Sequence, residues 1–513
     1  GGSCLLGPES RGNRMAAARN VLFVIIDQLR ADCLFGGLAA HDVLPNLRAL
    51  MGDGVTFRRH FSVANPCGPS RASILTGQYA MNHRSTRNGT PLPGDLPNLA
   101  TEVRKGGWLP LLFGYTDTTR DPRGLPPGDP MLKSYEQAMP GFVEACEMRL
   151  EESWPWRAHL AAKGYAVPPY PAIYRPAGPR PDDPAFYRAE DSDTAFLTDR
   201  TLGEIRVRPE GWFVHLTYLR PHPPLVAPAP WNRLHDPTTL PLPVRGGEVR
   251  HPFIAPACAA RPITGMVEGF PDLAPSDENV RMLRALYLGL AAEVDHHLGR
   301  IIADLKGRGL YDRTLIVVTA DHGEMLGDHG LWGKSTFHDA AWHIPLVIRD
   351  PGAPARGAAV DLPTEAVDVT PPILDCLGLA VPETMDGRTL KPFLHGGTPK
   401  AWRRYTFSEL DFGDPVAPTA VQLALGLQAE EANLAILRGA RHTLVHFNGG
   451  LPPLLFDHAD AGEMRDIAGD PAAQPALLEM TRVMLDHRMR HAGGRFARTM
   501  VTGAGVAVGA RSW

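Results

Sequence analysis

The sequence predicts an α/β protein, built on a large, mostly parallel mixed sheet sandwiched by helices. Residues 21–26, "VLFVII", form a continuous apolar run of the kind found in strands buried on both faces. Comparable runs occur at 212–219, 314–324 and 344–351. A long helical pattern lies between the runs at 212–219 and 314–324, and such alternation of strands and helices is typical of α/β folds.

The long helix is expected at about 277–306. Ser276 is a suitable N-cap, acidic residues occupy the first turn, and Gly307 closes the pattern. Apolar residues recur along it at spacings of three and four, which predicts one face that packs on the sheet. These residues are Leu283, Leu286, Leu290, Val294, Leu298, Ile301 and Leu305.

The 513 residues are enough for more than one domain. We expect a vector-derived leader at 1–14 and a catalytic domain at 15–400, in which proline-rich regions form long loops or insertions at the edge of the sheet. Short strand patterns with Gly-containing turns, and a helix after them, predict a small antiparallel α+β subdomain at 401–495. The Gly-, Ala- and Val-rich tail, 496–513, needs a docking surface unless it is disordered, and we expect it to contact another subunit.

Composition excludes several classes of protein. The formal net charge is −4, so there is no basic field for nucleic acid and no polybasic membrane anchor. The run at 21–26 is too short for a signal-peptide core or a membrane span, and we therefore expect a cytoplasmic location. Six scattered cysteines without a C-x-x-C pair argue against a disulfide framework and a zinc ribbon.

Two predicted strands end in groups that can bind a metal. Asp27 and Gln28 follow the first strand, and Asp321 and His322 follow the run that begins at Thr314. Ligands of open α/β sheets bind beyond the carboxyl ends of strands, so these residues are expected to meet. Either aspartate alone is more typical of a cap or a turn, but two carboxylates with an imidazole suit a divalent cation. The histidine favours Mn or Zn over Ca.

The segment 62–79, "SVANPCGPSRASILTGQY", places Cys67 among prolines and serines, which is not typical of a core strand. Its "CGPSR" matches C-x-P-x-R. Other matches lie in the order of the family, namely "IIDQLRAD" before it and, after it, "GYTDT", "RPHPP", "TADHGEMLGDHGLWGK" and a closing "LFDHADAGEMRDIAGDP". With these motifs, which spread over about 20–471, the chain resembles the sulfatase family of the alkaline phosphatase superfamily.

The resemblance implies an alkaline phosphatase-like fold and a modified nucleophile. A formylglycine-generating enzyme would oxidise Cys67 to formylglycine, an aldehyde that hydrates to a geminal diol. One hydroxyl attacks sulfur or phosphorus, and the other lets the aldehyde form again and expel the product. One divalent cation would be bound by Asp27, Cys67, Asp321 and His322.

The chain departs from the pattern of many sulfatases. Those proteins bind calcium through paired aspartates and an Asp-Asn pair, where this chain has Asp27-Gln28 and Asp321-His322. The variant is similar to the branch that holds phosphonate monoester hydrolases, their arylsulfatase relatives and choline sulfatases. That likeness again favours Mn or Zn.

The remaining site residues follow from matched motif positions. Arg71 would brace residue 67 and the transferring oxyanion, and Asn88 would donate to a non-bridging oxygen. His222 and Lys334 would stabilise or protonate the leaving oxygen. Each has a plainer interpretation as a surface, turn, loop or solvated residue. Gln28, Tyr115 and Asp117 would line the substrate pocket, whereas mid-strand His215 is expected to be a core histidine.

The sequence therefore favours hydrolysis of sulfate monoesters of the arylsulfatase type, with promiscuity toward phosphonate monoesters and phosphate diesters. Alternatives are a phosphonate monoester hydrolase or phosphodiesterase, a choline sulfatase, and a catalytically inactive binding protein on the same fold. The expected partners are a small-molecule ester, the formylglycine-generating enzyme and further copies of the chain, in a dimer or tetramer. No nucleic acid or membrane is expected.

Overall fold

A mixed eight-stranded sheet forms the centre of the protein. The computed structural model describes residues 20–41, 43–245, 247, 251–460, 462–494 and 498–509, so the predicted leader lies outside the described residues. The strand order is β10-β2-β9-β8-β1-β7-β5-β6. In that order the strands are Ala358–Val360, Val55–Phe57, Leu346–Arg349, Thr314–Thr319, Asn20–Ile26, Phe213–Tyr218, Pro110–Gly114 and Val143–Glu147.

All paired strands of this sheet run parallel except β9, which is antiparallel to both β8 and β2. The predicted mostly parallel mixed sheet is therefore confirmed. Strand β1 lies in its middle, where Val24 pairs with Leu216 of β7 and with Val318 of β8. Every residue of β1 is buried, as expected of a strand covered on both faces.

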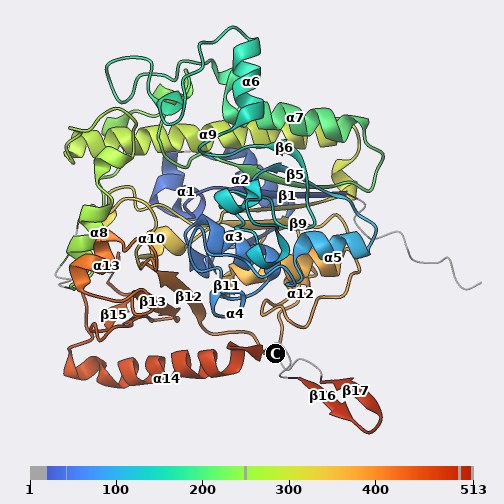
Figure 1. Ribbon diagram of the computed structural model, residues 1–513, viewed down its shortest axis with the longest axis vertical. Helices are drawn as coiled ribbons and strands as arrows, with labels where there is room; N and C mark the ends of the chain where they lie inside the picture. The colour runs from blue at the N-terminus through green and yellow to red at the C-terminus, as the bar shows by residue number, and fades with distance from the viewer. Residues whose placement is uncertain are drawn as a thin grey trace, which may run out of the picture.

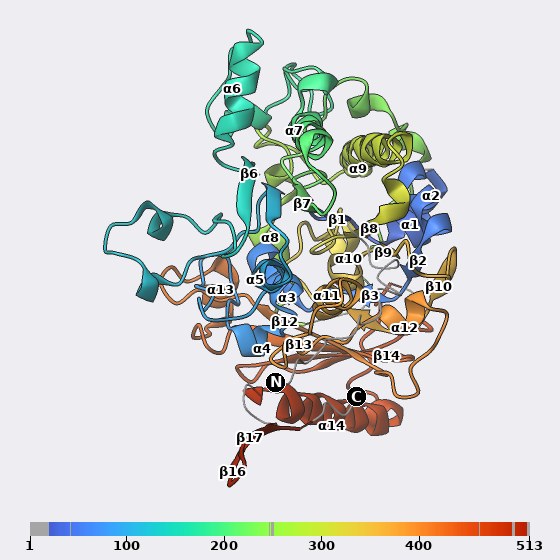
Figure 2. The ribbon, with the colours of Figure 1, turned by 90° about the vertical axis from the view of Figure 1, so that its right-hand side faces the viewer.

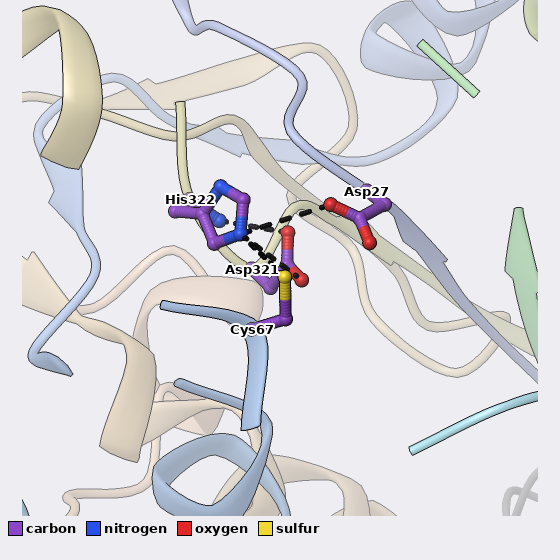
Figure 3. Close-up of side chains that lie close together, drawn as sticks. All are labelled: Asp27, Cys67, Asp321 and His322. Carbon is purple, nitrogen blue, oxygen red and sulfur yellow. Dashed lines mark hydrogen bonds and ion pairs between the residues drawn. The ribbon is translucent and has the colours of Figure 1, made fainter. Parts of the chain in front are cut away.

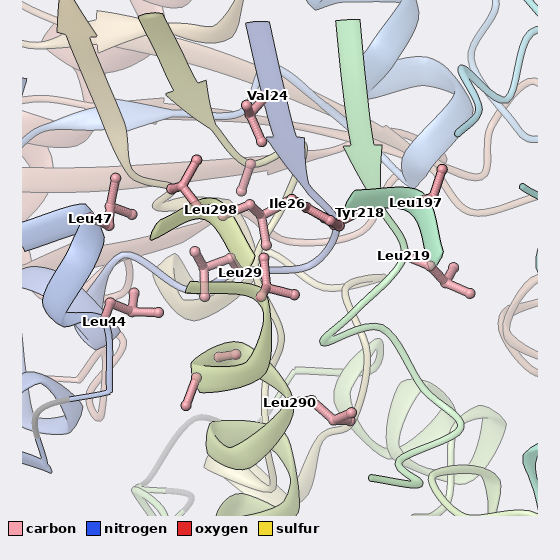
Figure 4. Close-up of a cluster of buried hydrophobic side chains, with 14 of the residues drawn as sticks. Val24, Ile26, Leu29, Leu44, Leu47, Leu197, Tyr218, Leu219, Leu290 and Leu298 are labelled. Atoms are coloured by element: carbon pink, nitrogen blue, oxygen red, sulfur yellow. The ribbon is translucent and has the colours of Figure 1, made fainter. Parts of the chain in front are cut away.

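Helices cover both faces of the sheet (Figures 1 and 2). Alternate residues of β1 face opposite sides. Val24 and Ile26 point into a core with α2 (Pro45–Asp53), α7 (Asp193–Val207) and α9 (Asp277–Gly307), as Figure 4 shows. Phe23 and Ile25 belong to the opposite core, beneath α3 (Cys67–Thr76), α5 (Leu99–Lys105) and α11 (Thr370–Cys376).

The long helix α9 begins as the sequence predicts. The Ser276 side chain caps it by accepting a hydrogen bond from the backbone N–H of Asn279, and Asp277 and Glu278 lie in the first turn, where they complement the helix dipole. The predicted apolar face is buried against the sheet, and Leu290 and Leu298 contact the same core as Ile26 (Figure 4).

A second sheet lies below the α3 layer. Strands β12 (Thr406–Asp411), β13 (Asn433–Arg438), β14 (His442–Phe447) and β15 (Leu454–Asp457) form the predicted antiparallel meander, and α14 (Gln474–His491) packs on it. The sheet also contains β4 (Ala64–Asn65), which pairs in parallel with β12. This added strand ends two residues before Cys67 and so joins the C-terminal region to the segment of the predicted nucleophile.

The proline-rich regions contain more regular structure than the sequence predicts. The first, 110–190, supplies β5, the edge strand β6 and helix α6 (Trp154–Ala162); the second, 220–275, supplies helix α8 (Ile254–Ala260). Their periodicity is weak because β6 is partly exposed and both strands are short. The other short elements are α1 (Asp32–Phe35), α4 (Ala80–His83), α10 (Asp339–Trp342), α12 (Lys391–Leu394), α13 (Ala420–Leu425), and the pair β3 (His60–Phe61) and β11 (Thr364–Glu365).

The tail forms a small hairpin. Strands β16 (Thr499–Thr502) and β17 (Gly505–Val508) pair with each other and project from the body beyond the end of α14 (Figures 1 and 2). Across the described ranges, no helix has the length and apolar character needed to cross a bilayer. Cysteines 33, 67, 146, 258 and 376 are all free thiols.

Three buried histidines predict how stability depends on pH. Burial lowers the pKa of His60, His83 and His215 to about 3 each, against an ordinary value of 6.5. His215 lies in the core as expected, stacked on Phe23 with its Nδ1 at 3.1 Å from the Phe23 carbonyl oxygen. Between these two pKa values the unfolded chain binds protons that the folded chain excludes. Stability is therefore complete above pH 6.5 and decreases as the pH falls.

We expect the free energy of unfolding to decrease by up to about 2 kcal/mol per buried histidine between pH 7 and pH 5. Chemical denaturation at several pH values measures this dependence. The substitution His215→Gln removes one contribution, so the decrease should become smaller whatever the absolute stability of the variant. An equal decrease in both proteins would contradict the assignment of His215 as a neutral core histidine.

Candidate active site

The carboxyl ends of β1 and β8 meet the first turn of α3 at one edge of the large sheet. Asp27 directly follows β1, Asp321 follows β8 after one residue, and Cys67 is the first residue of α3. Pro69 is compatible with this turn because the first N–H groups of a helix have no intrahelical acceptor. The Ser70 hydroxyl donates to the Asp321 carbonyl at 2.6 Å, so α3 is attached to the loop that follows β8.

Four buried side chains converge at this edge (Figure 3). Asp27, Cys67, Asp321 and His322 each offer a ligand atom, and these atoms lie within 4.8 Å of one another. His322 Nε2 is 3.1 Å from Cys67 Sγ and 3.7 Å from a carboxylate oxygen of each aspartate. Because His322 Nδ1 donates to the Gly323 carbonyl, its Nε2 carries the lone pair that faces the cluster.

The donor set fits a divalent cation. Oδ1 of Asp27 is buried and has no hydrogen-bond partner among the described residues, which is costly unless a cation or another donor binds it. Two carboxylates and a neutral imidazole, with the side chain of residue 67 as a further donor, suit Mn or Zn. The sequence-predicted ligands are thus brought together.

Arg71 lies behind the two carboxylates and is fully buried. Its Nε donates to Asp321 Oδ2 at 3.0 Å and its Nη2 to Asp27 Oδ2 at 3.2 Å. The guanidinium stacks over the Tyr115 ring at 4.3 Å, and the Tyr115 hydroxyl donates to Asp27. The sequence analysis assigned Arg71 to residue 67 and the transferring oxyanion. In the structure its side chain contacts the carboxylates and their neighbours, and its role toward the oxyanion stays a prediction.

Charge in the cluster is unevenly distributed. Burial and the neighbouring Asp321 raise the pKa of Asp27. Burial acts in the same direction on Asp321, but His322 and Arg71 outweigh it and hold the pKa of that carboxyl at about 2. Burial lowers the pKa of His322 to about 4. Burial and Asp27 raise the pKa of the Cys67 thiol well above its ordinary value, so an unmodified Cys67 is a poor nucleophile here.

A cavity of about 410 Å³ opens at Cys67. The sequence analysis named six site residues in addition to the metal ligands and Arg71, and all six line this cavity: Gln28, Asn88, Tyr115, Asp117, His222 and Lys334. The structure adds aromatic, apolar and charged residues that the sequence analysis did not identify: Tyr135, Glu136, Leu150, Tyr170, Arg261, Met266 and Trp332. Most of these residues belong to the proline-rich insertions, whose patterns carry no signal for a site.

Lys334 and His222 form a pair at the cavity. Lys334 Nζ lies 2.9 Å from His222 Nε2 and 2.8 Å from Gln28 Oε1. His222 Nδ1 is 2.5 Å from the Pro223 carbonyl oxygen and must donate to it, so Nε2 accepts from Lys334. Burial and the nearby Lys334 charge lower the pKa of His222 well below its ordinary value. Lys334 is therefore the charged donor and His222 the neutral acceptor.

Asn88 and Asp117 approach the nucleophile segment closely. Asn88 Oδ1 accepts from the Gly68 N–H at 3.0 Å. A Cβ at position 68 would lie 2.9 Å from Asn88 Oδ1 and 3.0 Å from the Asp117 carbonyl oxygen, which explains the glycine of "CGPSR". Asp117 has a left-handed backbone, with φ of 48°. Burial raises its pKa to about 8, with Arg71 opposing and Asp27 and Glu136 adding to the shift.

A mostly parallel mixed sheet that brings Asp27, Cys67, Asp321 and His322 together at its carboxyl edge is the arrangement expected of a hydrolase of the alkaline phosphatase superfamily. The chain belongs to the sulfatase family of that superfamily: the sulfatase family model matches residues 19–379. A second model, for the C-terminal region of N-sulphoglucosamine sulphohydrolase, matches residues 327–490. The family depends on a metal and on formylglycine, and its members and structural neighbours hydrolyse sulfuric or phosphonate esters, as this chain does.

Similar proteins cover nearly the whole chain. The multifunctional alkaline phosphatase superfamily protein PehA from Trinickia caryophylli is 37% identical over 497 residues, which is 92% of this chain and 96% of PehA. The phosphonate monoester hydrolase SpPMH from Silicibacter pomeroyi is 56% identical with a TM-score of 0.93, covering 96% of this chain and 99% of SpPMH. The phosphonate monoester hydrolase of Agrobacterium radiobacter is 39% identical with a TM-score of 0.90, covering 96% and 100%.

Removing one carboxylate tests the metal site. Asp27→Asn should lower the bound metal at least about tenfold, because it replaces a charged ligand with a neutral amide. Elemental analysis of purified protein measures the content. Asp199→Asn is the matched control, since Asp199 forms an exposed ion pair with Arg300. Full metal content in Asp27→Asn would show that the cation is bound elsewhere.

Proposed function

We propose that the chain is a formylglycine- and metal-dependent hydrolase whose main substrates are phosphonate monoesters and phosphate diesters. The observation that carries this proposal is the 56% identity to a phosphonate monoester hydrolase over 96% of the chain. Hydrolysis of sulfate monoesters, which the sequence analysis put first, is the second candidate, and the match to the sulfatase family model favours it. The substrate is a small molecule in both cases.

The shape of the cavity supports this order. A sulfate monoester carries one organic group, whereas a phosphonate monoester and a phosphate diester carry two. Two separate insertions supply part of the lining of the cavity, one with Tyr135, Leu150 and Tyr170 and the other with Pro262 and Met266. With a volume of about 410 Å³, the cavity can take an organic group against each of these walls.

We assign a separate role in this reaction to each residue of the site. When present, the cation polarises the ester oxygens, and formylglycine at position 67 supplies the attacking hydroxyl. Asp27, Asp321 and His322 would hold the cation, and Arg71 orients the two carboxylates and favours the charged form of each. Asn88 lies beside the first turn of α3, where its amide can bind a non-bridging oxygen.

Lys334 is the group that we assign to the leaving oxygen. It is the charged member of its pair with His222, and it lines the cavity together with Cys67. An ammonium next to the developing alkoxide or phenoxide stabilises negative charge in the transition state and can transfer a proton to it. Neutral His222 would then accept a hydrogen bond from Lys334, which fixes the direction of the ammonium group.

Burial of Cys67 bears on its maturation. The residue is only 5% exposed, and α3 holds it against His322 and the carboxylates. Because α3 and its neighbours bury this thiol, we expect a formylglycine-generating enzyme to convert it before α3 packs. The proposed partner is therefore an enzyme that acts on an unfolded segment. The cytoplasmic location stays a prediction.

A substrate panel tests the proposed function. The protein is first analysed for its metal, and the peptide that contains residue 67 is weighed to confirm the aldehyde. We expect kcat/KM for an aryl phosphonate monoester to exceed that for the matching aryl sulfate by at least about tenfold, a transition-state difference of about 1.4 kcal/mol. The opposite order would make sulfate esters the main substrates. An unmodified thiol in fully active protein would rule out the mechanism.

The exposed hairpin supports a homo-oligomer. Met500, Val501, Val506 and Val508 of β16 and β17 are 51–82% exposed, although all are apolar. An isolated two-stranded hairpin is at best marginally stable in water. The outer face of α14 nearby exposes Leu478, Leu485 and Met489. A second copy of the chain that covers the hairpin would remove these apolar side chains from water.

Truncation tests this arrangement. A chain that ends at Gly494 lacks the hairpin, and we expect it to have a lower mass in solution by light scattering or sedimentation. The control is Val416→Ser, which changes an apolar residue that is 90% exposed in a different region. If the truncated chain and the full chain have the same number of subunits, the hairpin is not an oligomer contact.

A further inference from the structure

Glu324 is a fully buried carboxylate beside the active site. It belongs to the matched segment "TADHGE", but neither the metal cluster nor the described lining of the cavity includes it. Its Oε1 accepts from the backbone N–H groups of Leu326 at 3.0 Å and Gly333 at 2.6 Å. Its Oε2 accepts from Nε2 of Gln28. Glu324 thus holds both Gln28 and the residue before Lys334.

The carboxylate determines which way the Gln28 amide points. The Glu324 oxygen Oε2 accepts a hydrogen bond from Gln28, so the NH₂ end of the Gln28 amide faces Glu324. The carbonyl end, Oε1, then faces Lys334, whose Nζ lies at 2.8 Å. The Gln28 backbone is fixed as well, because its N–H donates to Asp321 Oδ1 at 3.1 Å and its carbonyl accepts from the Tyr287 hydroxyl at 2.7 Å.

The orientation of the Gln28 amide also fixes the hydrogen bonds of Lys334 and His222. The ammonium group has three N–H donors. Among the described residues, Gln28 Oε1 accepts from one and His222 Nε2 accepts from another. These two acceptors leave one N–H for the cavity. An amide turned the other way would instead present its NH₂ to the ammonium group, and two donors would face each other.

We propose that Glu324 is a positioning residue, which orients the Gln28 amide so that Lys334 keeps one N–H directed at the leaving oxygen of the substrate. The assignment to the leaving oxygen rests on the proposed function. The orientation of the chain Glu324, Gln28, Lys334 and His222 does not, because it follows from the donors and acceptors alone.

Two isosteric variants separate orientation from charge. In Glu324→Gln, the new amide oxygen can still accept from Leu326 and Gly333, so its NH₂ faces Gln28. Gln28 then has to turn its oxygen toward position 324 and its NH₂ toward Lys334. In the exchanged double variant Gln28→Glu with Glu324→Gln, the new amide donates to the carboxylate introduced at position 28, and the other oxygen of that carboxylate accepts from Lys334. The double variant keeps the net charge and every hydrogen bond of the original arrangement.

The first measurement is kcat/KM for aryl esters whose phenols differ in pKa, with the matured, metal-loaded protein. We expect Glu324→Gln to lower kcat/KM about 100-fold for a poor leaving group and less than about threefold for 4-nitrophenol, because a good leaving group needs little help from Lys334. The double variant should recover most of the loss. A uniform decrease for all leaving groups, or no recovery in the double variant, would overturn the proposal.

The second measurement does not depend on activity. Thermal unfolding should show a lower Tm for Glu324→Gln and recovery in the double variant, with metal and after its removal by a chelator. Glu293→Gln is the control for replacing a buried carboxyl group by an amide outside the described cavity lining and should leave the leaving-group dependence unchanged. If the Tm recovers but the wild-type protein hydrolyses none of the esters, the proposed function fails and the orientation stands. If the Tm does not recover, the orientation is wrong.

Discussion

Two carboxylates, Asp27 and Asp321, are buried side by side at the edge of the large sheet, and the site depends on how their charge is compensated. Two buried negative charges without a counter-charge would be strongly destabilising. Arg71 donates to both carboxylates, and His322 Nε2 lies 3.7 Å from an oxygen of each. A cation held by the same carboxylates would compensate their charge further. Because Arg71 is one turn of α3 beyond Cys67, the contact that compensates the carboxylates also places residue 67 against them.

The small sheet also helps to hold the active site in place, through β4. Strand β4 pairs with β12, and Asn65 of β4 donates through Nδ2 to the Lys334 carbonyl at 3.2 Å. Three separate parts of the chain therefore position Lys334. Asn65 of β4 binds its carbonyl group, Glu324 binds the N–H of the preceding residue, and Gln28, which follows β1, binds its ammonium group. Such support is what a site needs if its groups are to be held in place before the substrate binds.

Much of this site could be predicted from sequence because the relevant signals are local. Asp27 and Asp321 directly follow buried apolar runs, and the rule for strand ends brings such residues together. The position of Arg71 was harder, since its spacing from Cys67 does not tell whether it faces substrate or carboxylates. Tyr135 and Tyr170 lie on insertions without periodicity, so no pattern marks them. Strand β4 has two residues and a partner far along the chain, and sequence patterns carry no information about such a pair.

The pairing of β4 with β12 also has a consequence for synthesis. Roughly 340 residues separate Cys67 from the start of β12, and at typical rates of about 5–20 residues per second a ribosome needs about 20–70 s to make them. During that interval the segment before Cys67 lacks its strand partner, and Asp321 has yet to be made for most of it. The order of the elements along the chain thus provides a period in which "CGPSR" is exposed, and the emergence of β12 brings that period to an end.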